Sequence, residues 1–140
     1  MNIRAGVISG FVATIVLSIL MIIKAAMGIM PDLNAIKMLA GMMGAPLVMG
    51  WVAHFFIGSI LWGVLFSLIV DKLPGGVVTS AIIFSIGAWI LMMVGPMPMA
   101  GAGFFGLGIG MMAPVATLIL HLIWGSVLGF TYQRLTRASD

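Results

Sequence analysis

The chain has 140 residues, of which 63% are hydrophobic and only 6% are charged. Soluble domains carry about a quarter charged residues, so this composition excludes an ordinary water-soluble fold and predicts an integral membrane protein. The net charge of +3 comes from six basic residues, which are too few and too scattered for a nucleic-acid surface. The lack of cysteine excludes disulfides and thiolate metal sites.

Four apolar stretches follow one another along the chain. They cover residues 5–23, 47–70, 76–94 and 115–132. A helix needs roughly 20 residues, at about 1.5 Å each, to cross the hydrocarbon of a bilayer. The stretches are continuous rather than alternating, so we predict an all-α membrane protein with four transmembrane helices instead of a β-barrel.

The basic residues predict the orientation of these helices. Four of them belong to one side of the membrane and two to the other: Arg4, Lys72, Arg134 and Arg137 against Lys24 and Lys37. By the positive-inside rule, we expect a multi-pass protein of the inner (plasma) membrane with both termini in the cytoplasm. Lys24 is then expected to extend toward the outer interface.

The two outer connections do not resemble ordinary loops. Residues 30–39 have the pattern of a short interfacial helix that starts near Asp32 and carries Leu33, Ile36 and Leu39 on one face. Residues 95–113 are rich in glycine and contain no charge. We expect this second segment to re-enter the membrane or to pack on the bundle, because water would leave its apolar surface exposed.

The two histidines of the chain open the same motif. His54 is followed by Gly58 and Ser59, and His121 by Gly125 and Ser126, at an offset of 67 residues. Self-similarity at a fixed period indicates a duplicated structural unit. We therefore predict one domain, 1–140, built from two parallel two-helix repeats, 1–70 and 71–140.

The histidine pair is the candidate binding site. Equivalent positions predict that His54 and His121 approach each other inside the bundle, at one depth, with Gly58 and Gly125 on the same helix faces to admit a backbone or a flat ligand. Two imidazoles could supply both axial ligands of a b-type haem, with Lys24 and Lys37 available to its propionates. They could also bind another metal or a quinone, or only form structural hydrogen bonds.

Methionine is the second unusual feature. The chain has 14, and many gather in the predicted outer half: Met42, Met43, Met92, Met93, Met97, Met99, Met111 and Met112. Thioethers are soft ligands for Cu(I). Methionine is also a flexible apolar residue that is common on adaptable contact surfaces. A methionine-rich docking surface and a copper site are both open, and the first is favoured.

Enzymatic activity is disfavoured by what the sequence lacks. The chain has no glutamate, and its three aspartates belong to interfaces or to the C-terminal end, so paired carboxylates for acid–base chemistry are missing. A transporter coupled to protons or Na⁺ would need an acidic residue in the middle of the membrane. None of the predicted spans contains one, so this class of protein is also disfavoured.

One resemblance is carried by the repeated motif itself. His-Leu-Ile-Trp-Gly-Ser-Val-Leu-Gly at 121–129, with its earlier copy at 54–63 and with Pro-Asp-Leu at 31–33, resembles small uncharacterised bacterial four-helix membrane proteins grouped as domains of unknown function. The resemblance implies a fold and a membrane location, and it implies no activity.

Three functions follow as hypotheses. The first is a non-enzymatic accessory or structural subunit of a larger membrane complex, such as a respiratory assembly, with the lipid bilayer and other subunits or further copies as its partners. The second is a b-type haem electron carrier that uses His54 and His121. The third is a membrane protein that handles copper or a small solute.

Overall fold

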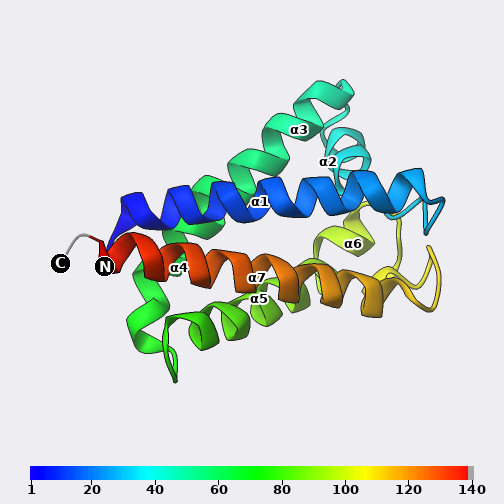
Figure 1. Ribbon diagram of the computed structural model, residues 1–140. Coiled ribbons are helices and arrows are strands. Elements are labelled where there is room, and N and C mark those ends of the chain that lie inside the picture. Colours follow the sequence, from blue (N-terminus) through cyan, green and yellow to red (C-terminus); the bar gives the residue numbers. More distant parts are fainter. Residues whose placement is uncertain (139–140) are drawn as a thin grey trace.

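The protein is a bundle of four membrane-spanning helical segments. The computed structural model describes residues 1–138, and within them the chain forms helices and turns without strands. The segments long and apolar enough to cross a membrane are Ile3–Ala26, Leu47–Lys72, Val77–Met99 and Ala113–Arg137. The predicted all-α fold with four spans is confirmed. Both termini lie at one end of the bundle (Figure 1), and we call the opposite end the distal end.

The spans are not all single helices. The first is α1 (Ile3–Ala26) and the fourth is α7 (Ala113–Arg137). The third joins α5 (Val77–Val94) to the short α6 (Pro96–Met99). The second contains four elements in sequence: α3 (Leu47–Phe55), the π-helical turn η1 (Phe56–Leu61), α4 (Trp62–Ile69) and the 3-10 turn η2 (Val70–Lys72).

Local hydrogen bonds define both ends of α1. The Asn2 side chain accepts a bond from the Ala5 amide at 2.9 Å and so caps the helix, while the Asn2 amide donates to the Tyr132 hydroxyl at 3.1 Å. At the distal end the Lys24 ammonium group donates to the carbonyls of Ile29 and Met30 at 3.0 and 2.7 Å. Lys24 therefore reaches the polar backbone beyond the helix end, as expected for a lysine near an interface.

The first distal connection contains the expected short helix, but it begins later than predicted. This helix, α2, spans Ala35–Met43, and its cap is Asn34, whose side chain accepts from the Lys37 amide at 3.0 Å. Asp32 lies three residues before the first helical residue, so the short helix is present but is displaced toward the C-terminus from the predicted 30–39. Asn34 has the extended backbone of a capping residue, and its side-chain oxygen plays the capping role that serine, threonine or aspartate has in other helices.

The second distal connection is folded onto the bundle. It includes the 3-10 turn η3 (Phe104–Gly106), and Met97 and Ala102 are buried in a cluster with Met93 of α5 and Leu33 of the first connection. Backbone bonds close the segment on itself, since the Gly108 amide donates to the Ala102 carbonyl at 2.8 Å. Its packing is what the lack of charge in 95–113 predicts.

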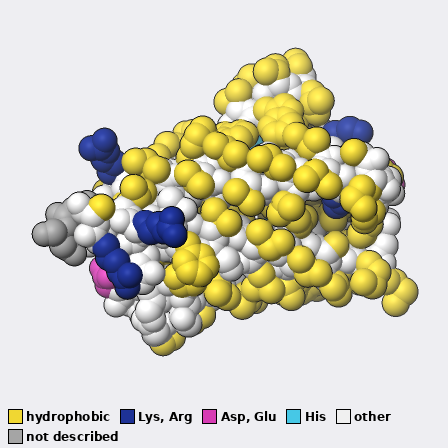
Figure 2. Space-filling view, viewed as in Figure 1, with side chains coloured by type: hydrophobic (Ala, Val, Ile, Leu, Met, Phe, Trp, Pro, Cys, Tyr) yellow, Lys and Arg dark blue, Asp and Glu magenta, His cyan; other side chains and the backbone are white. Residues whose placement is uncertain are grey.

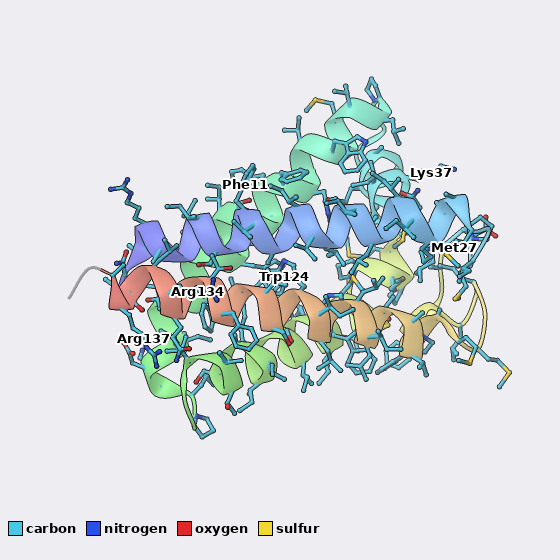
Figure 3. The ribbon with its side chains drawn as sticks, in the orientation of Figure 1. Phe11, Met27, Lys37, Trp124, Arg134 and Arg137 are labelled. Carbon is cyan, nitrogen blue, oxygen red and sulfur yellow. The ribbon has the colours of Figure 1, made fainter. Side chains whose placement is uncertain are left out.

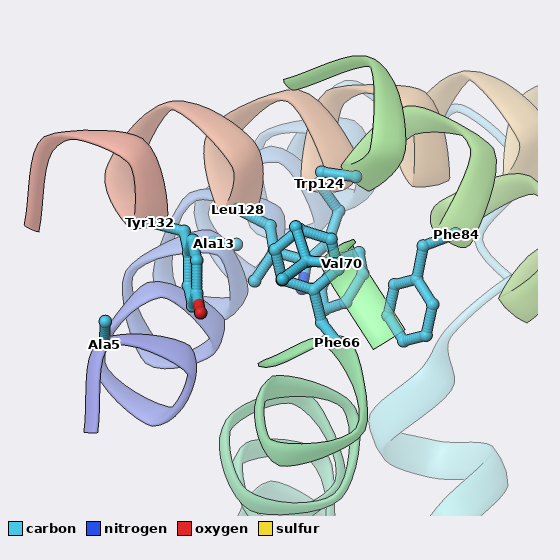
Figure 4. Packing of buried hydrophobic residues seen from close by; sticks show 9 residues of the cluster. Ala5, Ala13, Phe66, Val70, Phe84, Trp124, Leu128 and Tyr132 are labelled. Carbon is cyan, nitrogen blue, oxygen red and sulfur yellow. The ribbon is translucent and has the colours of Figure 1, made fainter. Parts of the chain in front are cut away.

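The central core is aromatic. Phe66 of α4 is fully buried and lies 5.4 Å from the ring of Phe84 of α5 and 5.3 Å from that of Tyr132 of α7 (Figure 4). Trp124 and Leu128 of α7 complete the cluster. These contacts join both predicted repeats, because α7 packs extensively on α1 as well as on α5.

Charge is confined to the two ends. Arg134 and Arg137 lie near the termini, and Lys37 lies at the distal end (Figure 3). The surface between the ends is largely hydrophobic in the space-filling view (Figure 2). An apolar belt between two charged rims is the surface expected of a protein solvated by lipid.

Candidate functional site

His54 lies on the inner face of α3, between two close helix contacts. One turn earlier, Gly50 meets the backbone and side chain of Ile36 of α2, and one turn later Gly58 meets the side chain of Thr14 of α1. These contacts turn the Gly50–His54–Gly58 face toward the protein, and only 9% of the His54 surface stays exposed. The structure thus confirms that His54 faces inward.

The surroundings of His54 are aromatic rather than polar. Its ring lies edge-on to Trp51 at 6.3 Å and to Phe55 at 5.9 Å, and Phe55 lies 5.4 Å from Phe11 of α1. Its Nε2 atom is buried and has no hydrogen-bond partner. A buried polar atom without a partner costs about 1–3 kcal/mol, so the position of this imidazole is not explained by local stability.

His121 is half-buried on α7 and is bonded locally through one ring nitrogen. Its Nδ1 lies 2.8 Å from the Thr117 carbonyl one turn earlier. A carbonyl can only accept, so Nδ1 carries the proton. The Thr117 hydroxyl accepts from Trp89 Nε1 of α5 at 3.0 Å and donates to the Ala113 carbonyl at 2.7 Å. His121 therefore belongs to a network that joins α5 and α7.

The structure does not bring the two histidines together through any direct interaction. Within residues 1–138, no hydrogen bond or ring contact joins the two imidazoles. α3 packs chiefly on α2 and η1, whereas α7 packs on α1 and α5. The same described range holds no group of three or more His, Cys, Asp or Glu side chains that could bind a metal ion.

Gly58 and Gly125 serve helix packing. Gly58 faces Thr14 of α1, and Gly125 faces Ser85 of α5, where an added Cβ would lie 2.5 Å from the Ser85 Cβ. Each glycine therefore packs on the membrane span that precedes its own span in the chain. Close helix approach through small residues is a general device in membranes. These two contacts correspond to each other, which supports a duplicated unit.

The methionines are divided between the core and the surface. Met93 and Met97 are fully buried in the distal cluster, where the Met93 sulfur lies 3.7 Å from the Thr117 hydroxyl. Met99 and Met111 are 74% and 87% exposed in the second distal connection. Part of the methionine-rich region is thus structural, and the exposed part remains available for contact with lipid or protein.

The π-helical turn η1 is a feature that sequence reasoning missed. It begins two residues after His54 and includes Ser59, whose buried hydroxyl has no hydrogen-bond partner. A spacing signal was present: His54 and His121 are 67 residues apart, whereas Gly63 and Gly129, which make equivalent helix contacts, are 66 apart. One additional residue in the second span fits a π-helical turn, where the bonds run from i to i+5.

A groove opens next to α3 at the distal end of the bundle. It has a volume of about 170 Å³ and lies between α1, α2 and α3, with one polar residue among its walls, which are formed by Met21, Ile22, Ala25, Asn34, Ile36, Leu47 and Trp51. Figure 1 shows how α3 diverges from α1 toward the distal end. A larger hollow of about 420 Å³ is shallow and is bordered by one face of α7 alone.

Fold and surface together define a four-span helical membrane protein, with its polar atoms concentrated at helix crossings. The chain belongs to a family of unknown function, DUF6789, whose model matches residues 1–140. The expected membership of an uncharacterised family is thereby confirmed. No curated protein and no solved structure matches the chain.

Proposed function

We propose that this protein is a non-enzymatic subunit of a larger membrane assembly, and that the outward face of α5 packs against a transmembrane helix of another protein. Both termini are then cytoplasmic in the plasma membrane, since the end with the termini carries four of the six basic residues. The sequence suggested a respiratory assembly because the two histidines were expected to face each other. No direct interaction joins the two imidazoles in the described chain, so the proposal does not name the kind of assembly.

One glycine carries this proposal. Seven of the eight glycines inside the spanning helices are in close contact with a neighbouring segment: Gly6, Gly10, Gly50, Gly58, Gly63, Gly125 and Gly129. At Gly87 of α5 an added Cβ would meet nothing within 4 Å. Glycine destabilises a helix by about 1 kcal/mol relative to alanine, so the seven are explained by packing and Gly87 is not.

The surroundings of Gly87 suit a helix interface. Ile83, Ile86, Ile90 and Leu91 are exposed on the same outward side of α5. A glycine between bulky aliphatic side chains leaves a notch into which another helix can pack closely, and in lipid such close packing is a main source of association. The notch explains the glycine if a partner helix fills it.

The haem alternative is less well supported. Coordination of one iron needs both imidazoles at one level with their nitrogens facing each other. Here no hydrogen bond or ring contact links the two imidazoles, and the described residues hold no group of three or more potential metal ligands. The bond from His121 Nδ1 to the Thr117 carbonyl is neutral on this point, because a ligating histidine commonly donates its other ring N–H to a carbonyl. Asp32 and Asp71, the aspartates of the described chain, are exposed at opposite ends, which agrees with the proposal of a non-enzymatic role.

The absence of cysteine allows a direct test. Gly87→Cys, labelled with a benzophenone maleimide and irradiated in native membranes, should give a discrete adduct with a partner. Val52→Cys, on the lipid-facing side of α3, is the matched control and should give none. An adduct at twice the mass of the chain would identify a second copy as the partner. Equal, diffuse labelling from both positions would contradict the proposal.

A further inference from the structure

Two equivalent helices differ in how their polar atoms are satisfied. On α7, His121 bonds to the Thr117 carbonyl at 2.8 Å and the Ser126 hydroxyl donates to the Leu122 carbonyl at 2.8 Å. On the second span, neither His54 Nε2 nor the Ser59 hydroxyl has a partner. The two copies share the histidine, glycine and serine, and the hydroxyl that is bonded at Ser126 is unbonded at Ser59, so the difference reflects the local structure near η1.

The π-helical turn η1 accounts for the missing hydrogen bond of the Ser59 hydroxyl. In a regular helix a serine hydroxyl reaches the carbonyl four residues earlier, as Ser126 does. The wider η1 turn changes that spacing. π-helical turns within α-helices are frequent at functional sites, and each buried polar atom without a partner in a native structure requires an explanation.

His54 does not line the groove described above, but its neighbour Trp51 does. Trp51 forms part of the groove wall, and the Trp51 and His54 rings are 6.3 Å apart. Ile36 forms another part and contacts Gly50, one turn before His54 on the same face. Helical side chains lean toward the helix N-terminus, so His54 leans toward the distal end, where the groove opens.

The depth of His54 limits the chemistry of a ligand. His54 lies seven residues after Leu47, the first residue of α3, and this corresponds to roughly 10 Å along the helix. A phosphate or another charged headgroup is strongly disfavoured at such a depth. The complementary group is therefore a neutral hydrogen-bonding atom on a lipid-soluble molecule.

We propose that the groove between α1, α2 and α3 binds a neutral ring carbonyl compound of the quinone type, whose carbonyl oxygen accepts a hydrogen bond from His54 Nε2. The ring lies against Trp51, and an aliphatic tail leaves between α1 and α3 into the lipid. His54 Nε2 is shielded in the ligand-free chain, so binding requires the imidazole to turn about χ2, a broad torsion that allows this movement.

The size of the groove agrees with this class of ligand. Its volume is about 170 Å³. An apolar protein cavity of about 150 Å³ is sufficient for benzene, so a six-membered ring fits, whereas a porphyrin does not. Its walls are apolar except for Asn34 and suit the ring and the tail, while His54, next to the groove, would supply an oriented polar contact of the kind that small-molecule sites contain.

The presence of only two histidines makes the test selective. The full chain, labelled with ¹⁵N-histidine and placed in lipid nanodiscs, gives two imidazole spin systems, which His54→Phe assigns. We expect titration with a decyl-tailed benzoquinone to shift the His54 Nε2 resonance saturably, with no change at His121. Decylbenzene, which has the ring and the tail without the carbonyl, should leave the His54 resonance unchanged.

Two variants separate the groove from the hydrogen bond. Ala25→Leu fills the groove without altering His54 and should weaken binding at least tenfold. His54→Phe keeps the ring volume and should weaken binding about five- to tenfold, measured by quenching of tryptophan fluorescence, because one hydrogen bond is lost. Ser126→Leu, at the shallow α7 hollow, is the control and should bind like the parent chain.

Three results would overturn the proposal. The first is a response of equal size at both histidines, which indicates partition of the quinone into the bilayer. The second is a shift with decylbenzene as large as that with the quinone. The third is unchanged affinity in Ala25→Leu. The second and third would show that neither the carbonyl nor the groove determines binding.

Discussion

The second and fourth spans carry the same motif and use it differently. In α7 the helix is regular, and His121 and Ser126 bond to carbonyls one turn earlier. In the second span the helix widens at η1, and His54 Nε2 and the Ser59 hydroxyl remain without partners. The histidine, glycine and serine are the same in both copies, so we attribute the difference at the serine hydroxyl to the geometry of the backbone. The irregular copy is also the one beside the α1–α2–α3 groove.

Deletion of a single residue should give the largest difference in unfolding free energy between the two spans. Removing Val127 from the regular α7 would rotate everything after it by about 100°. Leu128 and Tyr132 would leave the core, and we expect a loss on the order of 4 kcal/mol in unfolding free energy. Removing lipid-facing Ile60 from η1 should instead restore a regular helix and change stability by less than about 1 kcal/mol.

The measurement for this pair is SDS-induced unfolding of the detergent-solubilised chain, followed by circular dichroism. Equal losses of unfolding free energy for the two deletions would contradict the view that η1 accommodates one additional residue. They would also remove the argument that Gly63 and Gly129 are equivalent positions.

Alanine at the two motif glycines should give a smaller difference. A Cβ at Gly125 meets the Ser85 Cβ at 2.5 Å and the Ala81 carbonyl oxygen at 2.9 Å, so the α5 backbone has to move. The atoms nearest to a Cβ at Gly58 all belong to the Thr14 side chain, whose hydroxyl donates to the Gly10 carbonyl at 2.7 Å, and none of them is a backbone atom of α1. We expect Gly125→Ala to cost about 2–3 kcal/mol and Gly58→Ala about 1 kcal/mol.

The same unfolding assay applies, and Gly87→Ala is the control. It meets no neighbour, so it should stabilise the chain by up to about 1 kcal/mol through helix propensity. A larger loss at Gly58 than at Gly125 would reverse the comparison and would indicate that Thr14 is held rigidly by its contact with Trp124.

The smallest effect should come from the two serines. Ser126→Ala removes a formed hydrogen bond and should lower stability by about 0.5 kcal/mol. Ser59→Ala removes a buried hydroxyl that has no partner and should raise stability by about 0.5–1 kcal/mol. Opposite signs in the unfolding assay are the expected result. A loss at Ser59 would mean that its hydroxyl is bonded in the membrane.

The site was only partly predictable. The inward position of His54 followed from its depth, and the packing of 95–113 followed from its lack of charge. A contact between His54 and His121 was expected from repeat symmetry, yet none joins them within the described chain. Symmetry in sequence does not include the divergence of α3 from α1, where α3 packs on α2 instead.

The sequence by itself indicated lipid as the surroundings of the chain, the number of membrane spans and the distribution of charge between the two ends. These properties depend on composition and on apolar stretches long enough to cross a bilayer. It also indicated the small-residue crossings at Gly58 and Gly125. Only the tertiary structure decided which polar atoms are satisfied and which glycine faces outward. Hydrogen bonds and close contacts depend on shifts of an ångström or a turn of the helix, and a single additional residue in η1 is enough to change them.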